Sequence, residues 1–403
     1  MIAEGAQRVT IVTDEPEKYP KGYLPKEVAI HHRDRLDWVQ RQFREIKGTT
    51  IIIYDQTCAT EKRRRRKRGQ LTDTLQKVFI NPLVCEGCGD CSTQSNCLSV
   101  EPLETPLGRK RTINQSTCNK DFSCVKGFCP SFVTVSGQAI KNSSATSTGI
   151  SLPAIDLPQP ENRALHSPWG ILIAGVGGTG VITLGQILGI AAHMENKWIV
   201  TQDAAGLAQK GGATWSHVMI AQQEKDILTT RINTGGADLI LGSDAIVAAS
   251  KESMIFASEQ RTKVILNEHS PPTAEFILKE GWINPANSCA ESIRQLLGAD
   301  ATMHFDAHAV AIKCLGDSIY VNPIMLGYAW QKGLIPLALE TILRAFELNG
   351  VAVQQNQRAF EWGRHCAHDW AGVQAMIQEP STQLLPPSVD QVIDDRARFL
   401  KEY

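Results

Sequence analysis

Residues 171–192 read ILIAGVGGTGVITLGQILGIAA, and this stretch decides the fold. It has no charged residue over 22 positions, which is long enough for a membrane span. Six of the positions are glycine, and four of these glycines lie within residues 175–180. A tight turn between a buried strand and a buried helix explains this crowding better than a lipid-facing helix does. We therefore predict a strand–turn–helix unit here and no membrane span.

The residues around this unit alternate between strand-like and helix-like runs. Strands are predicted at residues 170–174, 198–201, 217–221, 238–241 and 264–267. Helices are predicted at residues 181–193, 245–250 and 336–348. The alternation predicts an α/β fold with a doubly wound, largely parallel, Rossmann-like sheet over residues 169–365. Residues 366–403 are expected to form a peripheral helical tail.

Composition narrows the class of protein. The chain has 403 residues, enough for two or three domains, and its net charge of −1 excludes a globally basic nucleic-acid binder. Of its 11 cysteines, seven lie between Cys85 and Cys129. Such clustering indicates metal chemistry in a reducing compartment, so a cytoplasmic protein is expected.

The segments before and after the cysteines are less regular. Residues 37–45 carry a helical apolar stripe and residues 49–54 (TTIIIY) predict a strand, together typical of the last piece of an α/β domain. Residues 62–68 are seven consecutive positive charges. This run fits a solvated loop, a nucleic-acid patch or a docking surface for an acidic partner. Residues 141–168 are rich in Ser, Thr and Pro and predict a linker.

The glycine-rich turn is a candidate cofactor site. Its glycines are Gly175, Gly177, Gly178 and Gly180. They follow an apolar run and open a helix, which is the context of a dinucleotide or phosphate turn. Asp203 lies where a nicotinamide enzyme holds its ribose. The alternative is a turn that serves only close strand–helix packing. No Gly-Lys-Ser/Thr follows, so a P-loop is excluded.

A second glycine-rich segment covers residues 206–213 and leads to His217. Lys210 and His217 are candidates to attract an anionic group near the first turn. The alternative is a surface loop with a hydrogen-bonded histidine.

The cysteine pattern is the strongest chemical signal. The candidate metal ligands are Cys85, Cys88, Cys91, Cys97, Cys118, Cys124 and Cys129. The first three have the C-x2-C-x2-C spacing of a [4Fe–4S] loop, and Cys129 precedes Pro130 as in two-cluster ferredoxins. The later gaps are wider than in those ferredoxins, so the match is partial.

A structural zinc site is the alternative, but the segment lacks histidine and paired CxxC arms. We expect one cluster and leave a second open, because seven cysteines are one short of eight. Cys58 could supply the eighth ligand or be a plain buried thiol. The isolated Cys289, Cys314 and Cys366 are expected in the core.

Taken together, these motifs resemble the indolepyruvate ferredoxin oxidoreductase family, within the 2-oxoacid:ferredoxin oxidoreductases. Residues 54–58 with the basic run resemble the end of the family's thiamine-diphosphate domain. Residues 85–97 and 123–130 resemble its iron–sulfur insert. Its gamma domain is matched by residues 174–180, 206–218, 322–327 and 329–333. The likeness implies five parts: a thiamine-domain tail (1–75), an iron–sulfur segment (76–140), the linker, a gamma domain (169–365) and the tail (366–403).

The resemblance implies oxidative decarboxylation of an arylpyruvate such as indolepyruvate to the aryl-acetyl-CoA, with ferredoxin as electron acceptor. Thiamine diphosphate with Mg would form the adduct, CoA would be the cosubstrate, and electrons would leave through the [4Fe–4S] cluster. The gamma domain would complete the 2-oxoacid and CoA side of the site.

One departure matters. The chain lacks the Gly-Asp-Gly run followed after about 25 residues by Asn that marks thiamine-diphosphate enzymes. It therefore resembles a C-terminal portion, truncated or from a split gene, that does not bind thiamine diphosphate. We expect it to be inactive without a thiamine-domain partner and to form an oligomer, and no catalytic residue is assigned.

Two other functions stay open. An NAD(P)- or FAD-linked iron–sulfur reductase would use Asp203 on a ribose. A zinc-dependent nucleic-acid binder would use residues 62–68, although the net charge and the cysteine spacing oppose it. In the leading hypothesis, the same basic run docks an acidic ferredoxin.

Overall fold

The computed structural model describes residues 1–137, 150–153, 155–161, 165–205, 212–273, 275–279, 281–378 and 388–402. The chain divides into two compact units, Met1–Asp73 and Thr74–Tyr403. Of the predicted linker, residues 141–168, residues 141–149, 154 and 162–164 lie outside the described residues.

The first unit is built on a three-stranded parallel sheet of order β2-β1-β3. Its strands are β1 (Arg8–Thr13), β2 (Ala29–His32) and β3 (Thr50–Asp55). Helix α1 (Leu36–Phe43) packs Val39 and Phe43 against Val12. The helix and strand predicted at residues 37–45 and 49–54 are thus confirmed.

The basic run is a helix, so the interpretation as a loop is wrong. Helix α2 spans Ala59–Lys67. Arg65 Nε donates to Glu61 Oε1 at 3.0 Å, and Lys62 Nζ reaches Asp14 Oδ2 at 2.5 Å. These pairs offset part of the repulsion among the like charges, and Lys and Arg are good helix formers.

The second unit begins with a small cysteine-bearing segment, residues 76–136. Strands β4 (Gln76–Ile80) and β7 (Phe132–Ser136) pair antiparallel. Strands β5 (Val100–Thr105) and β6 (Gly108–Ile113) form a hairpin, and α3 spans Asp90–Ser95. The core of this segment is Val78, Ile80, Cys85, Val100 and Ile113.

The larger part of the second unit is a six-stranded sheet of order β13-β12-β11-β8-β10-β9. Strand β10 runs antiparallel to β8 and β9, whereas the remaining neighbours pair parallel. The strands are β8 (Trp169–Val176), β9 (Trp198–Ala205), β10 (Ala213–Ala221), β11 (Leu239–Gly242), β12 (Lys263–Asn267) and β13 (Thr302–Phe305). The five predicted strands are confirmed, and β13 is one that the sequence did not reveal.

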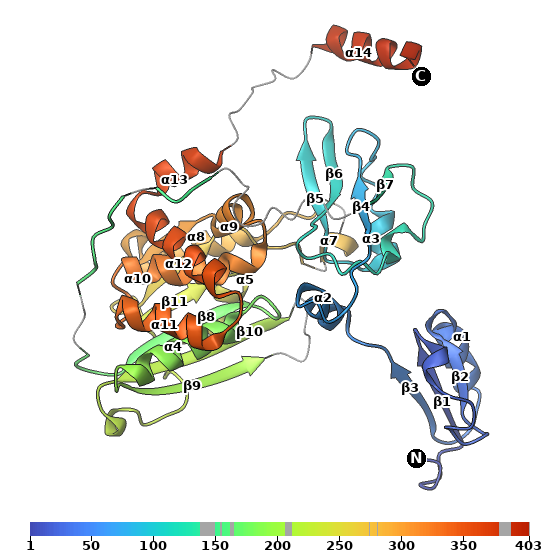
Figure 1. Cartoon of the computed structure of the whole chain (residues 1–403), viewed down its shortest axis with the longest axis horizontal. Helices are drawn as coiled ribbons and strands as arrows, with labels where there is room; N and C mark the ends of the chain where they lie inside the picture. The colour runs from blue at the N-terminus through green and yellow to red at the C-terminus, as the bar shows by residue number, and fades with distance from the viewer. Residues whose placement is uncertain are drawn as a thin grey trace. The chain divides into compact units, whose positions relative to one another are not determined.

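Helices cover both faces of this sheet (Figure 1), which confirms the doubly wound α/β fold. Side chains alternate along β8: Ile171 and Ile173 face one core, Leu172 and Ala174 the other. The first core is covered by α4 (Val181–Met194), α9 (Ala307–Leu315), α10 (Val321–Gln331), α11 (Leu339–Asn349) and α12 (Val353–His368). The second is covered by α5 (Ala245–Ala248), α6 (Lys251–Met254) and α8 (Ala286–Leu297).

Residues 171–192 thus form β8, a turn and α4, as predicted. None of the helices that the structure describes is long and apolar enough to cross a membrane. The C-terminal residues are helical, as expected, in α13 (Trp370–Ile377) and α14 (Val389–Glu402). The expectation that the whole tail is peripheral is wrong for α13, because its Val373 and Ile377 are buried in the first core.

Candidate functional site

The glycine-rich turn connects β8 to α4 at the carboxyl edge of the sheet. Gly178 and Gly180 have φ of +87° and +102°, which residues with a Cβ rarely adopt. At Gly175, a Cβ would lie 2.9 Å from Val181 Cγ2 and 3.2 Å from Ser243 Cβ. The Gly177 N–H donates to Gly212 O at 2.7 Å. Gly175 therefore serves close packing, and Gly177, Gly178 and Gly180 shape the turn.

A buried asparagine fixes this turn from the other side. Asn322, 2% exposed, donates from Nδ2 to Thr179 O at 2.9 Å and accepts at Oδ1 from Ser243 Oγ. Ser243 directly follows β11, and β11 neighbours β8, whereas β10 lies on the other side of β8. The strand order therefore reverses at β8, with β10 and β9 on one side and β11 on the other. Open α/β sheets bind ligands outside the carboxyl ends of the strands at such a point.

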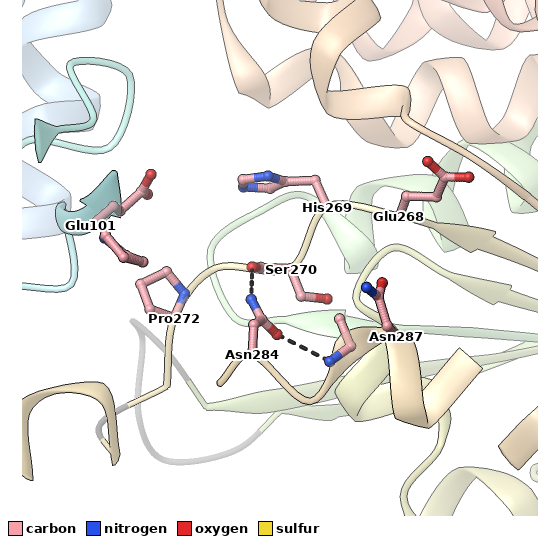
Figure 2. Close-up of a pocket in the computed structure, with 9 residues that line it drawn as sticks. Glu101, Glu268, His269, Ser270, Pro272, Asn284 and Asn287 are labelled. Carbon is pink, nitrogen blue, oxygen red and sulfur yellow. Dashed lines mark hydrogen bonds between the residues drawn. The ribbon is translucent and has the colours of Figure 1, made fainter. Parts of the chain in front are cut away.

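A cavity of about 240 Å³ lies next along this edge (Figure 2). His269 follows β12, and Glu101 enters from β5 on the opposite side of the cavity. Asn284 donates to Ser270 O at 2.8 Å and accepts from the Ala286 N–H at 3.0 Å. The lining is polar and joins the cysteine segment to the six-stranded sheet.

Burial sets the electrostatics of this cavity. Burial raises the pKa of Glu101. The side-chain amide of Asn114 donates to Glu101 Oε1 at 2.9 Å, which opposes this rise. Burial also lowers the pKa of His269, which stacks on His308 with ring centres 3.8 Å apart. Burial and the neighbouring His269 lower the pKa of His308 to about 4. The histidines are therefore neutral near pH 7, and polar hydrogen bonding rather than positive charge characterises the site.

Two candidate binding residues from the sequence, His217 for an anion and Asp203 for a ribose, are not supported by the structure. His217 is 2% exposed inside β10, and burial, aided by Arg231, lowers its pKa to about 4, so it attracts no anion by charge. Asp203 lies within β9, and β10 separates that strand from β8 and its glycine turn. A ribose-binding carboxylate follows the strand adjacent to the glycine turn, so the topology opposes the nicotinamide hypothesis. Lys210 and residues 206–211 lie outside the described residues.

The first cysteine loop follows β4. The Cys85 N–H donates to Asn81 O at 3.0 Å, and Gly87 and Gly89 flank Cys88 with φ of +77° and +86°. A Cβ at Gly87 would overlap the Arg109 carbonyl oxygen. The loop thus folds tightly, with Cys91 in the first turn of α3 and Cys88 exposed.

The remaining cysteines divide between two places. Cys97, Cys118 and Cys124 lie near one another: burial, with the Cys97 and Cys118 thiols, raises the pKa of Cys124 to about 12. The Lys120 N–H donates to Cys118 Sγ at 3.4 Å. Cys129 Sγ lies 3.0 Å from Ser131 Oγ, on the β7 side.

Backbone hydrogen bonds place Cys129 on the side of the first loop. The Ser131 carbonyl accepts from the Asn81 N–H at 2.8 Å, and the Asn81 carbonyl accepts from the Cys85 N–H. By loop and by these backbone bonds we assign the thiols to a first group (Cys85, Cys88, Cys91, Cys129) and a second group (Cys97, Cys118, Cys124).

The chemistry of these groups fits a cluster better than a single ion. In the part of the chain that the structure describes, no three His, Cys, Asp or Glu side chains converge tightly enough for one metal ion. A four-iron cluster instead takes each thiolate on a different iron atom. The thiols, the glycine cradle and the N–H···Sγ bond suit such a cluster. Cys314 and Cys366 are buried in the core, as expected, whereas Cys289 is only half-buried.

No pattern in the sequence points to Arg111 of β6. It is 9% exposed, and its buried Nε has no hydrogen-bond partner among the described residues. Its guanidinium packs against Gly89, where a Cβ would lie 3.1 Å from Nη2. Burial lowers the pKa of Arg111, and the thiols of Cys91, Cys85 and Cys88 oppose that shift. Arg111 also lines a cavity of about 790 Å³ with Cys88, Phe276 and Lys279.

Comparison with known proteins now identifies the larger part of the second unit. Residues 170–366 match the family described as pyruvate ferredoxin/flavodoxin oxidoreductase. A protein of Archaeoglobus fulgidus named indolepyruvate oxidoreductase subunit IorB is 32% identical over 202 residues, which span 48% of this chain and 92% of that protein. The chain belongs to the 2-oxoacid:ferredoxin oxidoreductase family.

Other similar proteins match about the same length of this chain. The subunit IorB of Methanothermobacter thermautotrophicus is 28% identical over 200 residues, 48% of this chain and 95% of that protein. Among solved structures, pyruvate oxidoreductase subunit PORC of Thermotoga maritima is 20% identical with a TM-score of 0.36, over 49% of this chain and 96% of that one. The gamma subunit of a keto/oxoacid ferredoxin oxidoreductase from Geobacter sulfurreducens is 21% identical with a TM-score of 0.34, over 50% and 98%.

The family match covers the six-stranded sheet and its helices. The cysteines from Cys85 to Cys129 precede residues 170–366, so their chemistry rests on their own geometry. The curated relatives are each named as a subunit of an indolepyruvate oxidoreductase, which agrees with the resemblance noted from the motifs.

Proposed function

We propose that this chain is the electron-transfer and gamma-domain portion of an indolepyruvate-type, arylpyruvate:ferredoxin oxidoreductase. The observation that carries the proposal is the seating of a cysteine segment against the family domain. Arg109 donates to the Trp282 carbonyl, and Arg111 lies over Phe276. A segment with seven clustered thiols thus packs on a domain of a ferredoxin-linked family.

The first group supplies four thiolates: Cys85, Cys88, Cys91 and Cys129 are proposed to hold one [4Fe–4S] cluster. The second group, Cys97, Cys118 and Cys124, is proposed to hold a second. Cys97 follows the first run of cysteines in the sequence but is assigned to the second cluster, and Cys129 follows the second run but is assigned to the first cluster. Two-cluster ferredoxins have the same pattern, in which the fourth cysteine of a run binds the other cluster. Bound clusters supply one-electron transfer, and the protein orients and partly buries them.

The carboxyl edge of the sheet is proposed to complete the 2-oxoacid and CoA side of the active site. Gly177, Gly178 and Gly180 present backbone at the start of α4, where a helix N-terminus favours an anion. The adjoining cavity offers polar groups for a substrate. Thiamine diphosphate with Mg is proposed to reside on a partner subunit, and the assembled oligomer would reduce ferredoxin.

An anaerobic reconstitution tests this proposal. The chain is combined with a thiamine-diphosphate-binding partner, CoA and ferredoxin, and ferredoxin reduction is followed with indolepyruvate, phenylpyruvate or pyruvate. The proposal expects reduction that requires both chains and is fastest with an arylpyruvate. Cys91→Ser should abolish electron transfer, whereas Cys289→Ser, outside both thiol groups, should not. Equal activity of the partner without this chain would contradict the proposal.

A further inference from the structure

The two cysteine loops repeat one another with a single change of ligand type. The first loop carries Cys85, Cys88 and Cys91 at intervals of three residues, and the second carries Cys118, Asp121 and Cys124 at the same intervals. Asp121 therefore occupies the position that Cys88 holds in the first loop.

The backbone follows the same register. Gly87 and Gly89, on either side of Cys88, have φ of +77° and +86°. Lys120 and Phe122, on either side of Asp121, have φ of +54° and +57°. Gly89 is the N-cap of α3, and Phe122 is the N-cap of the 3-10 turn Ser123–Val125. The two loops thus share both left-handed positions and the helical turn that follows.

The left-handed residues in the second loop are informative because they are not glycine. Left-handed backbone costs conformational energy for a residue with a Cβ, and such strain persists where surrounding structure requires it, often at binding sites. Lys120 is also the residue whose N–H donates to Cys118 Sγ at 3.4 Å. The strained loop therefore directs a backbone donor at a proposed ligand sulfur.

The surroundings of Asp121 fit a ligand position. Asp121 lies midway along the chain between Cys118 and Cys124, in the same loop. Ser123 donates from its N–H to Asp121 Oδ1 at 3.4 Å and from Oγ to Oδ2 at 3.1 Å. Asp121 is exposed, as is Cys88 in the first loop.

We propose that Asp121 is the fourth ligand of the second cluster, with a carboxylate oxygen in the place of a thiolate. This inference rests on the proposed function, because it requires that the second group binds iron and sulfide. It explains why seven cysteines suffice for two clusters and removes the need for Cys58. A carboxylate is a harder ligand than a thiolate and binds the iron of a sulfide cluster less firmly. The iron at Asp121 should therefore be the first to leave on oxidation.

The test compares the full chain, purified without oxygen, with Asp121→Ala, Asp121→Cys and Asp90→Ala. Asp90 lies in the first loop two residues beyond Cys88, so it controls for the loss of a loop carboxylate. Iron and acid-labile sulfide are counted, and EPR spectra are recorded before and after mild oxidation with ferricyanide. Two clusters predict about eight irons in the unmodified chain and in Asp90→Ala.

The variants at Asp121 should differ in a defined way. Asp121→Ala should lose about one iron per chain and show the EPR signal of an oxidised three-iron cluster, or lose the second cluster altogether. Asp121→Cys should keep about eight irons and, unlike the unmodified chain, retain all of them through oxidation. The alanine variant keeping about eight irons through oxidation, or the cysteine variant failing to hold a second cluster, would overturn the inference.

The same iron count distinguishes failure of the proposed function from failure of the role of Asp121. An unmodified chain with no iron and sulfide would contradict the cluster assignment as a whole. About four irons, unaffected by Cys97→Ala, would leave the first cluster in place and overturn the role of Asp121.

Discussion

The guanidinium carbon of Arg111 lies 4.2 Å from the centre of the Phe276 ring. Arg111 belongs to β6 of the cysteine segment, and Phe276 belongs to α7 (Glu275–Leu278), which follows β12 of the family domain. A guanidinium over an aromatic face gains cation–π attraction, which is stronger where the pair is desolvated. The pair holds a positive charge between the family domain and the first cysteine loop.

This placement predicts that Arg111 raises the reduction potential of the first cluster. A positive charge near a cluster favours the reduced form, which carries one more negative charge. Arg111→Gln should therefore make the midpoint potential more negative by at least about 59 mV, a tenfold change in the ratio of reduced to oxidised cluster. An EPR-monitored redox titration measures this. Arg111→Lys should recover most of the potential, and Lys110→Gln, on the opposite face of β6, should change it little. Equal potentials for all four proteins would contradict the prediction.

Gly87 should tolerate no side chain. Gly87→Ala combines a left-handed φ of +77° with overlap of the Arg109 carbonyl, so we expect a loss of about 3 kcal/mol or more of stability and loss of iron. Gly108→Ala is the matched control, because φ there is +87° but a Cβ has open space around it. It should cost about 1 kcal/mol and keep its iron. Iron analysis and thermal unfolding distinguish the two; equal effects would show that the overlap is not what matters.

The crossing of α10 and α12 depends on two glycines. A Cβ at Gly327 would overlap the Phe360 carbonyl, and a Cβ at Gly363 would overlap the Ile324 carbonyl. Gly327→Ala should therefore destabilise the family domain by about 3 kcal/mol or more. Gly189→Ala, in α4, meets only Thr201 Cγ2 at 4.0 Å and should stabilise by about 0.5–1 kcal/mol. Denaturant titration checks both signs, and a tolerated Gly327→Ala would contradict the close approach.

The glycine turn, five strands and three helices could be predicted from the sequence because their signals are local: apolar runs, β-branched residues and glycine punctuation. The cysteines could be proposed as ligands because ligand spacing is also local, and that role stays a prediction. The partners of Asn322 and Arg111 could not. Asn322 bonds Thr179 across 143 residues, and Arg111 meets an aromatic ring from another part of the second unit. Such contacts depend on tertiary packing, which no single-sequence pattern encodes.

Two interpretations of the sequence are wrong, each for its own reason. Strand β10 lies between β8 and β9, so Asp203 on β9 is separated from the glycine turn, although its spacing along the chain is that of a ribose-binding carboxylate. The basic run became helix α2 because Glu61 and Asp14 offset its repulsion. The equal spacing of Cys118, Asp121 and Cys124 is visible in the sequence. The left-handed backbone on both sides of Asp121, which matches that around Cys88, is visible only in the structure.

His217 should make stability depend on pH. Burial lowers its pKa to about 4 in the folded protein, against about 6.5 in the unfolded chain. The unfolded chain then binds more protons between pH 6.5 and 4, so the free energy of unfolding falls as the pH is lowered through that window. It should not change on this account above about pH 6.5. The contribution is about 3 kcal/mol.

His217→Leu removes this titration while His308, which titrates in the same direction, remains in both proteins. The difference in unfolding free energy between pH 7.5 and 4.5 should therefore be smaller in the variant. A pH dependence identical to that of the unmodified chain would contradict the assignment.

Helix α2 is proposed to dock an acidic ferredoxin. Replacing residues 63–66 by glutamine should raise the KM for ferredoxin several-fold at low ionic strength and flatten its salt dependence, with kcat little changed. The control replaces the same number of arginines elsewhere in the first unit, namely Arg33, Arg35, Arg41 and Arg44. If both sets of substitutions leave KM unaltered, α2 is not the docking surface.

We propose that this chain carries iron–sulfur clusters on a domain of the 2-oxoacid:ferredoxin oxidoreductase family. The most direct measurement is a count of iron, acid-labile sulfide and zinc in the anaerobically purified full chain, with an EPR spectrum after dithionite reduction. We expect about eight irons and about eight sulfides per chain, with signals from reduced [4Fe–4S] clusters. Stoichiometric zinc with no sulfide, before and after reconstitution, would contradict it.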